Sequence, residues 1–116
     1  MKRPTSINIS GIKYKIKYNL EDSDAFGITD SETNTISLRD NIPVDKMIRV
    51  MAHEITHAVI FETPFSIRKR FDVEEMCDII GYHFIAALRD NPHVTQYLLQ
   101  ETKDDNEGED DGITSN

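Results

Sequence analysis

The sequence predicts a segregated α+β domain, in which N-terminal antiparallel β-hairpins form a small sheet packed on three helices. In the first 40 residues, short segments alternate apolar with polar residues, as in half-buried strands. From residue 44 onward, apolar residues recur every three or four residues, as in amphipathic helices. The length of 116 residues is typical of one domain. We therefore expect a single folded unit over residues 1–100.

Two hairpins account for the first half of the chain. Residues 7–18 alternate apolar side chains with lysines and contain Ser10-Gly11, a pair suited to a tight turn. A second hairpin is predicted over residues 26–38, with a turn-rich centre. Its second strand, residues 35–38, is predicted to lie at a sheet edge, where it could hold an extended peptide by backbone pairing.

Three helices account for the second half. The first is predicted from Val44 to Phe61, with Pro64 ending it, the second from Asp72 to Leu88, and a short third after Asn91-Pro92. On the second helix, a helical projection with 100° per residue predicts that Cys77 points into the core. The same projection places Gly81 on an edge where the small residue would let two helices approach closely.

Charge is distributed unevenly along the chain. The net charge is −8, yet residues 101–116 carry seven acids and one lysine, which leaves the first 100 residues nearly balanced. This acidic tail has one apolar residue, Ile113, and is predicted to be disordered. Its expected role is to keep the protein soluble, and the alternative is an interaction arm or a segment that covers a cationic site. The folded part has no basic field, so nucleic acid is not an expected partner.

Composition also limits the compartment. The longest apolar run, Phe84 to Leu88, is far shorter than the roughly 20 residues of a membrane span, and residues 4–8 interrupt any signal-peptide pattern. The single cysteine, Cys77, excludes an internal disulfide and a multi-cysteine zinc cluster. We therefore expect a cytoplasmic protein without a membrane partner.

The segment His53-Glu54-Ile55-Thr56-His57 predicts a zinc site. Histidines four residues apart on a helix lie one turn apart on nearly the same face, so their imidazoles can converge on one ion. Glu54 is placed to take a proton from a metal-bound water, as in zinc proteases. On a helical projection the histidines lie opposite the apolar face, so the alternative is a pair of solvent-facing histidines without a metal.

A catalytic zinc ion usually has three protein ligands. The position six residues after His57 is Thr63, which excludes the class with a third histidine. Glu74 and Glu75 follow on the second predicted helix, and the projection favours Glu74, with Asp78 one turn later able to orient a ligand imidazole. The alternative for these acids is an ordinary solvated face.

These residues resemble the gluzincins and, more closely, the minimal zincin-like metallopeptidases of phages and mobile elements related to the ImmA/IrrE type. The likeness spans residues 7–99 and includes an Ile-x-Leu strand (36–38) before the motif helix and Asp90-Asn91-Pro92 near the end. It implies that His53, His57 and Glu74 bind Zn²⁺, that Glu54 is the general base, and that Asp78 supports a ligand. The doubled acid leaves Glu74 versus Glu75 open.

The predicted activity is therefore a zinc-dependent metallopeptidase that hydrolyses peptide bonds of a protein or peptide substrate, such as a regulator or repressor. The alternative is a catalytically silent, zinc-stabilised protein-binding module of the phage-regulator type. Four further side chains are candidates for oxyanion stabilisation, although each is more typical of a structural or surface position. These are Tyr82, His83, His93 and Tyr97.

Overall fold

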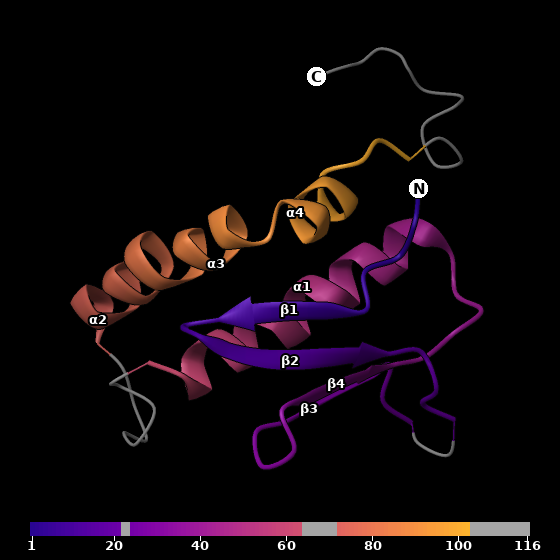
Figure 1. Cartoon of the computed structure of the whole chain (residues 1–116), viewed down its shortest axis with the longest axis horizontal. Helices are drawn as coiled ribbons and strands as arrows, with labels where there is room; N and C mark the ends of the chain where they lie inside the picture. The colour runs from indigo at the N-terminus through magenta and orange to yellow at the C-terminus, as the bar shows by residue number, and fades with distance from the viewer. Residues whose placement is uncertain (22–23, 64–71, 103–116) are drawn as a thin grey trace.

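The computed structural model describes residues 1–21, 24–63 and 72–102, and confirms a small α+β fold (Figure 1). None of its described helices is long and apolar enough to cross a membrane. The acidic tail is predicted to be disordered over residues 101–116, and all of it except Glu101 and Thr102 lies outside the described part. The elements are β1 (Ser6–Ile9), β2 (Ile12–Lys17), β3 (Gly27–Asp30), β4 (Thr35–Leu38), α1 (Val44–Phe61), α2 (Val73–Asp78), the π-helical η1 (Ile79–Phe84), α3 (Ile85–Asp90) and α4 (Pro92–Leu98).

Both predicted hairpins are present, and a parallel pair joins them. The strand order is β1-β2-β4-β3, with antiparallel pairs β1/β2 and β3/β4 and a parallel pair β2/β4 in which Ile16 lies beside Ile36. The first hairpin turns at Ser10 and Gly11, both at positive φ, where glycine is favoured.

The prediction that residues 35–38 form an edge strand is wrong, because β4 lies between β2 and β3. Its side chains Ile36 and Leu38 are fully buried and belong in the middle of the sheet. The edge strand on this side of the sheet is β3, whose Ile28 is 44% exposed.

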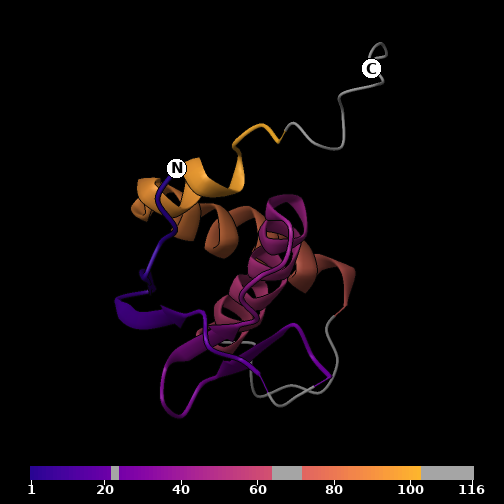
Figure 2. The same cartoon turned by 90° about the vertical axis from the view of Figure 1, so that its right-hand side faces the viewer.

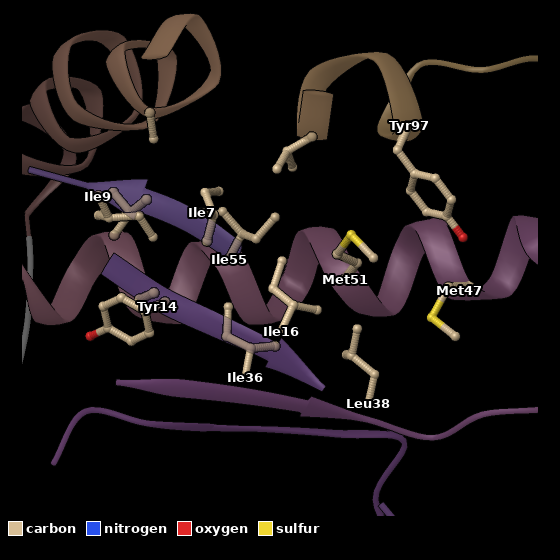
Figure 3. Close-up of a cluster of buried hydrophobic side chains, with 14 of the residues drawn as sticks. Ile7, Ile9, Tyr14, Ile16, Ile36, Leu38, Met47, Met51, Ile55 and Tyr97 are labelled. Carbon is tan, nitrogen blue, oxygen red and sulfur yellow. The ribbon is translucent and has the colours of Figure 1, made fainter. Parts of the chain in front are cut away.

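The core lies between the sheet and α1, which crosses one sheet face (Figures 2 and 3). Tyr14 and Ile16 of β2 point inward while Lys13, Lys15 and Lys17 are exposed, which confirms the predicted alternation. Helix α1 has the predicted bounds. Pro64, which is predicted to end it, lies outside the described residues. The buried apolar side chains of α1 lie on one face: Met47, Met51, Ile55, Ala58 and Val59.

A hydrogen bond anchors the C-terminal end of α1 to the sheet. The hydroxyl of the fully buried Tyr14 donates to Glu62 Oε2 at 2.7 Å. Burial, and then this hydrogen bond, raise the pKa of Tyr14 well above its usual value. The bond fixes the last turn of the helix that carries the histidine motif.

The second predicted helix is continuous from Val73 to Asp90 but is not uniformly α-helical, because residues 79–84 form η1. A π-helix closes i→i+5 hydrogen bonds, so a constant step of 100° does not follow its side chains. The inward prediction for Cys77 is wrong: α2 has no buried residue, and Cys77 is exposed. Gly81 is also exposed, and a Cβ built there meets no atom within 4 Å, so no close helix approach depends on it.

The junction between α3 and α4 covers the other edge of the sheet. Asn91 is fully buried; its Oδ1 accepts from the Asn8 backbone N–H at 2.8 Å, and its Nδ2 donates to the Asn8 and Ala87 carbonyls, each at 2.7 Å. His93 Nε2 lies 2.9 Å from the Ser6 carbonyl on the same strand. Because side chains satisfy the outward backbone groups of β1, this edge is closed.

We predict that Asn91→Ala lowers the free energy of unfolding by roughly 2–4 kcal/mol, because it leaves backbone groups of β1 and α3 without partners. Urea denaturation measures this loss. The exposed Asn19 offers a control, since Asn19→Ala should change stability by less than about 0.5 kcal/mol. Equal effects of the two substitutions would show that Asn91 does not tie the helices to the sheet.

Candidate functional site

The two motif histidines converge at the surface of α1. His53 and His57 are exposed, and their Nε2 atoms lie 3.2 Å apart, with the rings nearly perpendicular at 75°. The observed separation is that of a hydrogen bond between the two rings. It is also close to the roughly 3.3 Å between two nitrogens bound at about 2.0–2.1 Å to one tetrahedral zinc ion, so it is compatible with two positions of such a site. The His57 ring also stacks on Phe61, with ring centroids 6.3 Å apart, which restricts its orientation.

Glu54 differs from the histidines on either side of it because it is buried, with 6% of its surface exposed. Its carboxylate turns toward β3, where Oε1 accepts a hydrogen bond from Thr29 Oγ1 at 2.7 Å. The Thr29 hydroxyl is also within 3.0 Å of the Glu54 backbone carbonyl. Since the hydroxyl has one proton and the carboxylate oxygen is the closer acceptor, Thr29 holds the Glu54 side chain against β3.

Gly27 provides the space that Glu54 occupies. A Cβ built on Gly27 would lie 2.8 Å from Glu54 Cγ and 3.0 Å from Glu54 Oε2. Any side chain at this position therefore displaces Glu54 or strand β3. Sequence reasoning missed both Gly27 and Thr29, although a glycine inside a predicted strand is a known sign of close backbone approach.

A cleft of about 390 Å³ opens beside Glu54, between β3 and the N-terminal half of α1. Residues 25–27 form one wall, and Lys46, Arg49 and Val50 form the other, as far as His53 and Glu54. The sequence analysis did not single out the two cations, even though they lie on the same helical stripe as the histidines. The cleft runs past residues 25–27, where the edge strand begins, and reaches His53, one of the two candidate metal ligands, so it offers space for an extended chain.

Among the residues that the structure describes, no third ligand lies beside the two histidines. Glu74 is exposed on α2, and Glu75 forms a capping box in which its Oε1 accepts from the Asp72 N–H at 3.1 Å. Across residues 1–21, 24–63 and 72–102, no group of three or more His, Cys, Asp or Glu side chains is arranged to hold a metal ion. Within the same ranges, Asp78 makes no hydrogen bond to either imidazole.

The helical projection favours Glu74 over Glu75 by their angles from a buried apolar face. Since α2 has no buried residue, it has no such face, and the projection does not discriminate between the two. The choice between the two carboxylates stays open. The four oxyanion candidates do not line the cleft: Tyr82 is 72% exposed on η1, His83 is half-buried on the same segment, His93 contacts β1 and Tyr97 is in the core.

Comparisons with known proteins provide no assignment: no family model matches the chain, and no curated protein or solved structure is significantly similar to it. The likeness to zincins consequently depends on the motif residues themselves. The geometry of α1 and β3 carries the functional argument.

We predict that Gly27→Ala lowers the free energy of unfolding by about 1–3 kcal/mol, since the new methyl group overlaps Glu54. Gly81→Ala is the matched control: its methyl group enters open space, and stability should stay equal or rise because alanine favours helices. Thermal and urea unfolding of the two variants provide the comparison. Similar changes in both would mean that Gly27 is not in tight contact with Glu54.

Proposed function

We propose that the protein is a zinc-dependent metallopeptidase that hydrolyses peptide bonds of a protein or peptide substrate. The observation that carries the proposal is the arrangement on α1: two Nε2 atoms 3.2 Å apart, with a buried carboxylate between them in sequence and a cleft beside them. As part of this proposal we place the protein in the cytoplasm, because its one cysteine, Cys77, is free and exposed.

The donor set suits zinc. Neutral imidazole nitrogens and one carboxylate are a usual ligand combination of catalytic zinc, and His53 and His57 supply the first two. We assign the third position to Glu74, with Asp78 as the residue that orients a ligand imidazole and Glu75 as the competing carboxylate. When bound, zinc would polarise the scissile carbonyl and lower the pKa of a coordinated water toward about 7.

Glu54 is the residue that would move the proton. Among the described residues, its carboxylate accepts one hydrogen bond, from Thr29 at Oε1, and we assign the role of general base to Oε2. Oε2 would accept a proton and then donate it to the leaving amine. For both steps the Glu54 side chain has to stay in one position. The packing on Gly27 and the bond from Thr29 supply that constraint.

Strand β3 would bind the substrate backbone. Of the two sheet edges, β1 is covered by Asn91 and His93, whereas no described residue pairs with the outer side of β3. An extended peptide added to β3 would pass Glu54, because Thr29 contacts that side chain directly. The role that the sequence analysis gave to residues 35–38 thus passes to the neighbouring strand.

One observation favours the alternative of a zinc-stabilised binding module without turnover. The described residues bring two ligands together and not three, and a protein-bound partner could complete such a site. The buried Glu54 argues for turnover, since a purely structural site has no use for a base.

We predict that Glu54→Gln retains one zinc per chain and loses cleavage by a factor of about 10²–10⁴, because the amide cannot accept the proton. Zinc content is measured by elemental mass spectrometry and cleavage by sequencing the products of a proteome-derived peptide library. His53→Ala and His57→Ala are the controls and should lose zinc. Undiminished cleavage by Glu54→Gln would remove Glu54 as the base, and a wild-type protein that binds zinc but cleaves nothing would favour the binding module.

A further inference from the structure

Two cations lie on the same stripe of α1 as the histidines and line the same cleft. Arg49 lies one helical turn before His53, which is about 6 Å along the axis at a rise of 1.5 Å per residue. Lys46 lies two turns before His53, about 10 Å along the axis. Both line the cleft between α1 and β3 that ends at His53 and Glu54.

Within the described part of the chain, few negative groups neutralise these two charges. The Lys46 ammonium lies 3.8 Å from the centroid of the Phe26 ring, and no carboxylate among the described residues is within salt-bridge distance of it. Arg49 lies 3.7 Å from Asp45, yet its side chain is 70% exposed, so this contact contributes little. Glu54, the one carboxylate among the described residues that line the cleft, is turned toward Thr29.

The Lys46 ammonium over the Phe26 ring is a fixed positive group on the wall of this cleft. The chain as a whole has a net charge of −8. A ring face attracts an ammonium and limits its motion, so Lys46 is held in the cleft at a small entropic cost. Val50 and Phe26 line the same walls and can cover the backbone of a bound chain. The cleft therefore complements an extended peptide that carries a negative side chain.

We propose that this cleft selects peptides with Asp or Glu two or three residues from the scissile bond, through Lys46 and Arg49. An extended chain advances about 3.3 Å per residue, so separations of about 6 Å and 10 Å from His53 correspond to two and three residues. The proposal rests on the peptidase function for the position of the scissile bond. Recognition of the acidic side chain itself needs neither zinc nor turnover.

A binding measurement tests recognition without catalysis. Three fluorescein-labelled, alanine-rich nonapeptides carry Asp, Asn or Lys at the same two positions, and their affinity for full-length Glu54→Gln protein is measured by fluorescence anisotropy, with and without zinc. We expect the Asp peptide to bind about tenfold more tightly than the Asn peptide, with the advantage shrinking as salt is raised. Equal affinities for the Asp and Asn peptides would overturn the proposal.

Charge reversal identifies the residues responsible. Lys46→Glu with Arg49→Glu should reverse the order of the Asp and Lys peptides, and the milder Lys46→Gln with Arg49→Gln should abolish the preference while preserving the fold. The matched control is Lys13→Glu with Lys15→Glu, which makes the same charge change on the exposed face of β2 and should leave the Asp preference intact. A preference that follows the β2 lysines instead would overturn the assignment to the cleft.

Cleavage-site profiling separates this proposal from the proposed function. With zinc-loaded wild-type protein and the peptide library, we expect Asp and Glu to be enriched two or three residues from the cut, and the enrichment to vanish in the Lys46→Gln, Arg49→Gln variant. Cleavage without acidic enrichment overturns the cleft assignment and leaves the peptidase intact. Absence of any cleavage, together with selective binding of the Asp peptide, overturns the peptidase and supports the cleft as an acidic-peptide site.

Discussion

Glu54 is buried between two exposed histidines, and strand β3 is what makes this difference possible. The backbone at Gly27 comes so close to α1 that no side chain fits between them, and Thr29 on the same face of the strand donates to the carboxylate. Burying a carboxylate is costly unless it has a hydrogen-bond partner, so Thr29 is needed as much as the space. The other features of the site, including the cleft, are arranged around this contact.

The two edges of the sheet differ in whether other residues cover them, and we assign them different roles on this basis. Asn91 satisfies both backbone groups of Asn8, so the helices downstream of α1 are tied to β1 and that edge cannot accept a peptide. The β3 edge borders the cleft and the carboxylate of Glu54, the proposed general base. A small four-stranded sheet thus has one edge for stability and one for the proposed substrate.

Local patterns in the sequence predicted local structure well. The bounds of α1, the two hairpins and the convergence of His53 with His57 all follow from periodicities of two and 3.6 residues. The strand order does not follow from these periodicities, because the sequence of residues 35–38 does not indicate that they pair in parallel with β2. The same applies to Gly27 and Thr29, whose partner Glu54 is 25 or more residues away in the chain, and to the π-helical turn that shifts the second helix.

The central claim is that one divalent ion is held by both imidazoles beside Glu54. A diffraction map at the zinc absorption edge, from crystals of full-length protein grown with equimolar zinc, tests it most directly. We expect one peak about 2.0–2.1 Å from Nε2 of both His53 and His57, with the Glu74 carboxylate as a third ligand and a position left for solvent. A peak bound to Glu75 would correct the third ligand alone, whereas no peak between the two imidazoles would contradict the account.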